Sequence, residues 1–245
     1  MSIKPNETTV FILAAGRGLR MMPLTADTPK PLLKIGELSL IEHHITRLAS
    51  KGFKQFVINV AYLGDQIQQA IGNGSRWGVH IAFSDEQSLG ALETAGGIQH
   101  ALHLIESDYF LCVNADIWTD FDFNELLFGL SQSLITSNFS GAIVMVENPK
   151  HNPDGDFCLY SNRENLFEAI LHNSKTNPAL TSYTFSGIGL YSKAAFTTLP
   201  PGKRALAPLL RQWIDNNSLF GTVYDGQWSD IGTPERLSEI NHTLN

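Results

Sequence analysis

An apolar run at residues 10–13, V-F-I-L, leads directly into a loop that contains Gly16 and Gly18, and this feature constrains the fold more than any other. The run predicts a buried strand, and the glycines predict a loop whose backbone a ligand can approach closely. Two glycines would also suit a plain strand-to-loop turn. A dinucleotide-binding fingerprint is excluded because it needs a third glycine where this chain has Met21. A P-loop is excluded because no G-x-x-x-x-G-K-[ST] run occurs in the sequence.

The same loop carries two cations. Arg20 offers a planar fork of donors that suits phosphate oxygens. Lys30 lies between Pro29 and Pro31, whose fixed φ angles limit how far its ammonium group can stray. The loop is therefore predicted to hold a triphosphate, with Arg20 and Lys30 on its phosphates.

Helical and strand patterns alternate after this loop. Ser39 is expected to cap a helix that ends near Gly52. Strands are expected at residues 56–60 and 79–83, with a helix between them that ends at Gly72. Such alternation is typical of βαβ units. We predict an α/β fold with a mainly parallel, mixed central sheet flanked by helices.

Two aspartates are candidate metal ligands. Asp116 follows a strand predicted at residues 109–113, and ligands of parallel sheets lie beyond the carboxyl ends of the strands. Asp230 lies in a loop near the end of the chain and would supply a second carboxylate. A few protein oxygens, with phosphates supplying the rest, suit Mg²⁺. The nearby Asp120 and Asp122 are better explained as helix caps.

The segment L-E-T-A-G-G-I at residues 92–98 has the pattern of a helix start. Thr94 is expected to cap this helix, with Gly96 and Gly97 in its first turn. Glycine is about 1 kcal/mol less favourable than alanine inside a helix, so the pair indicates that a ligand approaches the backbone there. An ordinary loop would also account for it.

The second half of the chain changes character. Strands are expected at residues 142–146, within 156–172 and at 182–191, around a polar loop rich in Pro, Asn and Gly. This pattern indicates a small β lobe rather than a separate domain. Ser186 and Gly187 interrupt the last strand, which predicts either a bulge or a close ligand.

Composition narrows the partners. The formal net charge of −7 argues against nucleic acid or an anionic membrane as the main partner. Cys112 and Cys158 have no metal-ligand spacing. The sequence has no apolar run long enough for a signal segment or a membrane span, so a cytoplasmic location is expected.

The compound motif G-x-G-x-R-M-x-P-L-T at residues 16–25, followed by T-P-K-P-L at 28–32, resembles the signature of the sugar-1-phosphate nucleotidyltransferases. Other segments are similar to the small bacterial members that uridylylate N-acetylmuramate α-1-phosphate in peptidoglycan recycling. These segments are L-E-T-A-G-G-I, N-A-D-I-W-T-D, D-G-D-F, T-F-S-G-I-G-L-Y, L-A-P-L-L-R-Q and G-Q-W-S-D-I-G-T-P-E-R-L. The resemblance implies a Rossmann-like nucleotidyltransferase fold, Mg²⁺ as cofactor, UTP and a sugar 1-phosphate as substrates, and release of pyrophosphate.

The resemblance also assigns residues. The length of 245 residues and the 43% hydrophobic content predict a single domain over residues 1–245, and the resemblance implies a nucleotide-binding half at 9–135 and a sugar-phosphate-binding half at 136–245. The nucleotide would lie along Ala14, Ala15, Gly16, Gly18, Leu19, Arg20, Lys30, Glu86, Gly96 and Gly97. The sugar phosphate would face Asn114, Gly155, Asp156, Ser186 and Gly187. Asp116 and Asp230 would bind the metal.

The sugar, the base and the oligomeric state stay open. N-acetylmuramate carries a lactyl carboxylate that calls for a cation, and three arginines are candidates: Arg76, Arg204 and Arg211. The alternatives are a mannose-1-phosphate guanylyltransferase, a glucose-1-phosphate uridylyl- or thymidylyltransferase, and a catalytically silent sensor of nucleotide sugars. Retention of the cations and aspartates named above argues against the sensor.

Overall fold

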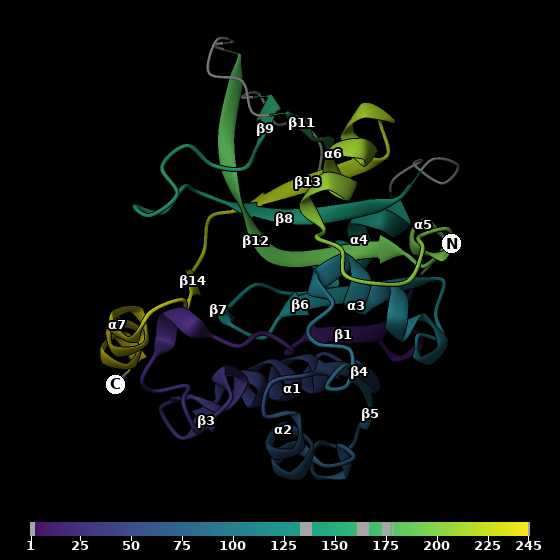
Figure 1. Ribbon diagram of the computed structural model, residues 1–245. Helices are drawn as coiled ribbons and strands as arrows, with labels where there is room; N and C mark the ends of the chain where they lie inside the picture. The colour runs from purple at the N-terminus through teal and green to yellow at the C-terminus, as the bar shows by residue number, and fades with distance from the viewer. Residues whose placement is uncertain (1–2, 133–138, 161–166, 173–176, 178, 245) are drawn as a thin grey trace.

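The computed structural model describes residues 3–132, 139–160, 167–172, 177 and 179–244 (Figure 1). Its central sheet has the strand order β10-β13-β8-β12-β6-β1-β4-β5. In that order the bounds are Glu168–Ala169, Leu219–Tyr224, Gly141–Val146, Leu180–Ser192, Tyr109–Asn114, Thr9–Leu13, Gln55–Val60 and His80–Asp85. Strands β6, β1, β4 and β5 run parallel, as do β8 and β13, whereas β12 runs antiparallel to both β6 and β8. The predicted mainly parallel, mixed sheet is confirmed.

Helices cover both faces of this sheet. Alternation along β1 sends Val10 and Ile12 into one core and Phe11 into the other. The first core packs against α1 (Leu40–Ser50), α2 (Gly64–Ile71) and α4 (Asn124–Gln132). The second packs against α3 (Glu93–Ala101), α5 (Ala194–Thr197) and α6 (Ala207–Asp215). In the part of the chain described here, no helix is both long and apolar enough to cross a membrane.

The first predicted helix illustrates how local chemistry sets the boundaries. Ser39 caps α1, and its N–H donates to the Glu42 carboxylate at 2.9 Å in a capping box. Ile41, Ile45 and Leu48 lie on one face of the helix and are fully buried. The cap and the apolar period predicted α1 correctly because both signals lie within the helix itself.

The start of α3 differs from the prediction. The helix begins at Glu93, after Leu92, so the assignment of Thr94 as its cap is wrong. The N–H groups of Ala95 and Gly96 donate to the Arg204 carbonyl at 3.0 and 3.1 Å. The backbone carbonyl of Arg204, from a distant segment, therefore caps the N–H groups that the Thr94 side chain was expected to cap.

Short strands extend the second half. β9 (Phe157–Tyr160) and β11 (Leu171–His172) pair beside the long β12 (Figure 1), which confirms strands within 156–172, although 161–166 lie outside the described residues. The register of β12 against β8 shifts between Phe185 and Gly189. Gly187 has a φ of +83°, and a Cβ there would lie 2.7 Å from the Asn114 amide nitrogen. Of the two alternatives at this interruption, the structure contains the bulge.

Candidate functional site

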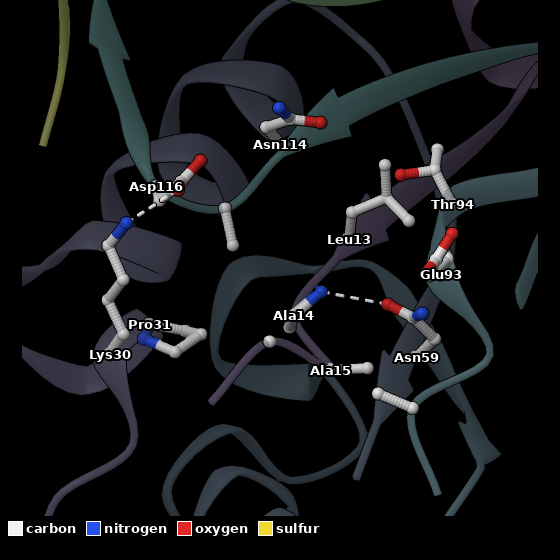
Figure 2. A pocket seen from close by; sticks show the side chains of 13 residues that line it. Leu13, Ala14, Ala15, Lys30, Pro31, Asn59, Glu93, Thr94, Asn114 and Asp116 are labelled. Carbon is white, nitrogen blue, oxygen red and sulfur yellow. Dashed lines mark hydrogen bonds and ion pairs between the residues drawn. The ribbon is translucent and has the colours of Figure 1, made fainter. Parts of the chain in front are cut away.

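Three cavities adjoin one another beyond the carboxyl ends of β1 and β6. The cradle cavity, about 410 Å³, is lined by Gly16, Arg17, Gly18, Leu19, Arg20, Met21, Lys30, Asp116 and Gly232. The central cavity, about 290 Å³, shares Gly16, Lys30 and Asp116 with it and is also lined by Ala14, Ala15 and Asn59 (Figure 2). The outer cavity, about 470 Å³, shares Glu93, Thr94 and Asn114 with the central one and is also lined by Asp156 and Arg211. The shared residues make the three cavities successive parts of one groove.

Lys30 and Asp116 meet where the cradle and central cavities join. The Lys30 ammonium lies 2.5 Å from Asp116 Oδ2, and their side chains are 9% and 36% exposed. Lys30 begins the short 3₁₀ helix η3 (Lys30–Leu32), and Figure 2 shows its side chain reaching across to Asp116. The ammonium is thus held in place, while the carboxylate is open enough to contact a second ligand.

The glycine loop shapes the cradle cavity. Gly18 has a φ of +61°, and a Cβ there would lie 3.0 Å from Lys30 Cβ, so glycine lets the loop and Lys30 approach. The 3₁₀ helix η2 (Leu19–Met21) follows and carries the exposed Arg20 into the cavity lining. The cradle therefore has two exposed guanidiniums, those of Arg17 and Arg20, and the anchored ammonium of Lys30 on its walls.

The two predicted metal ligands occupy neighbouring backbone positions. β7 (Ile117–Thr119) pairs antiparallel with β14 (Trp228–Asp230), which sets Asp230 opposite Ile117. The Ile231 N–H donates to the Asp116 carbonyl at 2.7 Å. The backbones of the two predicted ligands are therefore adjacent, and Asp116 lines the groove, where a hard cation such as Mg²⁺ would also take oxygens from its substrate.

The Asp230 carboxylate has its own partners on the far side of β14. Its Oδ1 lies 2.5 Å from Arg236 Nη1 and 3.1 Å from His151 Nε2. These residues line a fourth cavity of about 600 Å³. Within the described ranges, no group of three or more His, Cys, Asp or Glu side chains has a metal-binding arrangement. The protein offers carboxylates in small number, and a ligand would have to supply the rest.

A buried hydrogen-bond chain joins the glycine loop to α3. Asn59 Oδ1 accepts from the Ala14 N–H at 2.8 Å, and Asn59 Nδ2 donates to Glu86 Oε1 at 2.8 Å. Glu86 Oε2 accepts from the Leu92 N–H at 2.8 Å. Asn59 was not predicted as a site residue, although an amide near the carboxyl end of the otherwise apolar strand β4 was the available signal.

Several residues expected at the nucleotide serve packing in the structure. Among the described residues, Glu86, Gly96 and Gly97 line none of the four cavities. A Cβ at Gly96 would clash with the Gly202 carbonyl, and one at Gly97 would lie 2.7 Å from Glu86 Oε1. Other atoms do lie close to the backbone of Gly96 and Gly97, and those seen in the structure belong to the protein itself.

The sugar-side residues divide in the same way. Asn114 and Asp156 line the outer cavity. Gly155, Ser186 and Gly187 line none of the four cavities among the residues described, and the buried Ser186 hydroxyl donates to the Val144 carbonyl at 2.7 Å. The bulge of β12 therefore lies against Asn114, which lines the outer cavity, and does not line the cavity itself.

The three candidate arginines lie in different places. Arg211, at the exposed side of α6, lines the outer cavity. Arg76 pairs with Glu42 at 2.9 Å on the α1 side. The backbone carbonyl of Arg204 accepts hydrogen bonds from the first turn of α3. Of the three, Arg211 is the one that reaches the groove.

Neighbouring titratable groups support the β7–β14 pair. His44 is buried in α1, and burial lowers its pKa to about 4, which leaves the ring neutral near pH 7. Its Nε2 donates to the Ile117 carbonyl at 2.8 Å, because a carbonyl oxygen can only accept. Asp122 accepts from the Asn124 N–H at 3.1 Å, as a residue capping α4 should. The same expectation for Asp120 is wrong, because its carboxylate accepts from the Gln227 N–H at 2.9 Å and holds the loop before β14.

Comparison with known proteins identifies the family of this chain. The family model described as "Nucleotidyl transferase" matches residues 9–245. The chain is 45% identical to an N-acetylmuramate alpha-1-phosphate uridylyltransferase of Neisseria meningitidis, over 94% of this chain and 95% of that protein. It is 26% identical to a mannose-1-phosphate guanylyltransferase of Mycobacterium tuberculosis, over 94% of this chain and 62% of that one.

A solved structure shares the fold. A proposed glucose-1-phosphate thymidylyltransferase from Bacillus anthracis, crystallised with sucrose, superposes with a TM-score of 0.78. The alignment covers 96% of this chain and 94% of that chain at 21% identity. At this identity the likeness supports the arrangement of helices and strands, and the Rossmann-like architecture expected from the sequence agrees with it.

Proposed function

The chain belongs to the nucleotidyl transferase family, and from that premise we propose that it transfers the uridylyl group of UTP to N-acetylmuramate α-1-phosphate. Pyrophosphate is the second product. The observation that carries the proposal is the identity to the Neisseria enzyme, which extends over nearly all of both chains. The groove offers the matching chemistry, with cations at one end and hydrogen-bonding side chains at the other.

The reaction joins two anions. An oxygen of the sugar phosphate attacks the α-phosphorus of UTP, and the bond to the oxygen that bridges the α- and β-phosphates breaks. Pyrophosphate leaves with that bridging oxygen. Because no carbon or proton centre needs activation, positioning and charge neutralisation supply most of the catalysis.

Lys30 and Arg20 fit the triphosphate. Lys30 is anchored beside Asp116, so its charge is directed at the junction of the cradle and central cavities without reorganisation. Arg20 is exposed on the cradle wall and can close on the pyrophosphate as it leaves. We assign both residues a catalytic role on the leaving group.

Asp116 and Asp230 would hold a divalent metal, which we propose to be Mg²⁺. Held by these residues, Mg²⁺ would supply positive charge that neutralises the phosphates. Asp116 lies in the groove lining, and β14 sets Asp230 beside the backbone of Asp116 and Ile117. For Asp230 to face the groove, its carboxylate must turn away from Arg236 and His151.

The outer cavity fits the sugar phosphate. Asn114 and Asp156 supply hydrogen-bonding groups, and Arg211 supplies the cation that a lactyl carboxylate requires. We further propose that residues 9–135 and 136–245 act as one domain, because β6 of the first half pairs with β12 of the second. A cytoplasmic protein with small-molecule substrates, and without nucleic acid or membrane partners, fits the acidic net charge of −7.

The test is pyrophosphate release with UTP and Mg²⁺ in four parallel reactions. These contain N-acetylmuramate 1-phosphate, N-acetylglucosamine 1-phosphate, glucose 1-phosphate and mannose 1-phosphate. We expect the highest kcat/KM with the muramate, and Arg211→Gln should reduce that preference over N-acetylglucosamine 1-phosphate. Preference for another sugar in the unaltered protein would contradict the proposed substrate, and no release with any sugar would favour the sensor.

A further inference from the structure

Glu93 has an unusual backbone conformation. Its φ is +61°, in the left-handed region, and within the described part of the chain only Leu63 and Asn217 share a positive φ among non-glycine residues. A side chain is strained there, whereas glycine adopts this conformation freely. Strained residues of this kind tend to lie at functional sites, provided that the surrounding structure holds them in place.

The surroundings of Glu93 hold its backbone from both sides. The preceding Leu92 donates its N–H to Glu86 Oε2 at 2.8 Å, and its carbonyl accepts from the Arg204 N–H at 2.9 Å. Two residues later, the Ala95 N–H donates to the Arg204 carbonyl at 3.0 Å. The conformation is imposed by these neighbours, so glycine would suit the position better if the side chain had no role.

The Glu93 side chain makes an exposed ion pair with the rest of the protein. Its carboxylate lies 3.4 Å from the Lys203 ammonium, and the two side chains are 44% and 67% exposed. An ion pair so exposed contributes little to stability, because water screens it and both side chains lose freedom on pairing. This contact does not explain why a strained position carries glutamate.

The position of Glu93 in the groove offers an explanation. Together with Thr94 and Asn114 it lines both the central and the outer cavity. An ionised carboxylate only accepts hydrogen bonds, and it repels phosphate, so the substrate groups that suit it are neutral donors such as hydroxyls. Of the cations assigned to phosphate, Arg20 lines the cradle cavity, to which Glu93 does not contribute, whereas Lys30 lines both the cradle and the central cavity.

We propose that Glu93 is a specificity-determining residue that accepts hydrogen bonds from substrate hydroxyls where the two parts of the groove meet. The proposal rests on the proposed function, which places a nucleotide on one side of Glu93 and a sugar phosphate on the other. The hydroxyl can come from the ribose or from the sugar. The strained backbone is the means by which a charged side chain is kept at this junction.

The experiment compares Glu93→Gly and Glu93→Gln with the unaltered protein. Glu93→Gly relieves the strain, so its Tm should equal or exceed that of the unaltered protein, while kcat/KM should fall by about 10- to 100-fold. Glu93→Gln keeps an acceptor oxygen and should lose less. Asn217→Gly is the matched control, because it relieves the same strain at a residue that lines neither the central nor the outer cavity, and its kcat/KM should not change.

Substrate analogues identify the hydroxyl. With 2′- or 3′-deoxy-UTP, or with 4- or 6-deoxy forms of the sugar 1-phosphate, one analogue should abolish the difference between Glu93→Gly and the unaltered protein. A wild-type kcat/KM in Glu93→Gly, a difference that persists with every analogue, or a lower Tm in this variant would overturn the proposal. Failure of the proposed function is a separate result, because the unaltered protein would then release no pyrophosphate.

Discussion

Replacing Asn59 by alanine tests whether the buried chain from Ala14 to Leu92 holds the site together. Asn59 and Glu86 are 2% and 0% exposed, and the two Asn59 hydrogen bonds are both 2.8 Å long. Asn59→Ala removes both bonds at once. The Ala14 N–H and one oxygen of the Glu86 carboxylate are then left without their partners.

The magnitude follows from these two groups. A buried polar group without a partner costs about 1–3 kcal/mol, and more when it is charged, which gives about 3–5 kcal/mol for the pair. Asn59 also lines the central cavity, so water can replace part of the lost bonding. We therefore expect the free energy of unfolding to fall by about 2–4 kcal/mol. For a chain of this size that lowers Tm by about 4–15 °C.

The assay is urea-induced and thermal unfolding, followed by UTP binding by calorimetry. Asn152→Ala is the matched control, because Asn152 Nδ2 also makes two side-chain bonds, to Asp156 at 3.2 Å and Thr184 at 3.1 Å, in a more exposed place. Its loss should stay below about 1 kcal/mol. Equal destabilisation by the two substitutions would refute the argument that burial of the Asn59 bonds makes them important.

Three other substitutions test the site and its support. Lys30→Ala should lower the rate of pyrophosphate release about 10²- to 10³-fold with the far-UV circular dichroism unchanged, and an unchanged rate would remove Lys30 from the mechanism. Asp116→Asn and Asp230→Asn should each weaken Mn²⁺ binding measured by electron paramagnetic resonance in the presence of UTP, and unchanged binding by either would exclude that residue as a ligand. His44 should destabilise the protein by about 3 kcal/mol as pH falls from about 6.5 towards 4, because the unfolded ring then binds a proton that the buried ring, with its pKa lowered to about 4, does not. His44→Gln should flatten the dependence of the unfolding free energy on pH in that window, and an unaltered slope would contradict the assignment.

Local signals predicted the elements of the fold well. The apolar run at residues 10–13 became β1, and the Ser39 cap with its apolar period became α1, since each signal and its partner lie within one element. Thr94 failed as a cap for the opposite reason. The Arg204 carbonyl that takes its place is more than a hundred residues away along the chain, and no local pattern carries that contact.

The site was predictable where topology alone decides proximity. Lys30 and Asp116 were chosen from a loop and a strand end on the same edge of the sheet, and the structure places their charged groups 2.5 Å apart. Asp230 was predicted as a second carboxylate from a loop near the end of the chain, and its backbone lies beside β7. The direction of its side chain, towards Arg236 and His151, depends on packing that the sequence does not encode locally.

The glycines mark the limit of this reasoning. A glycine in a helix or strand signals that something approaches the backbone, but the sequence does not say whether that is a ligand or the protein. At Gly97 and Gly187 the atoms that a Cβ would meet belong to Glu86 and Asn114, so the close approach that these glycines signal includes atoms of the protein itself. Glu93 is the converse case, because its backbone would suit glycine and yet the residue carries a charged side chain into the groove. A side chain kept where the backbone would be better without one is therefore stronger evidence of ligand contact at this site than the glycines beside it.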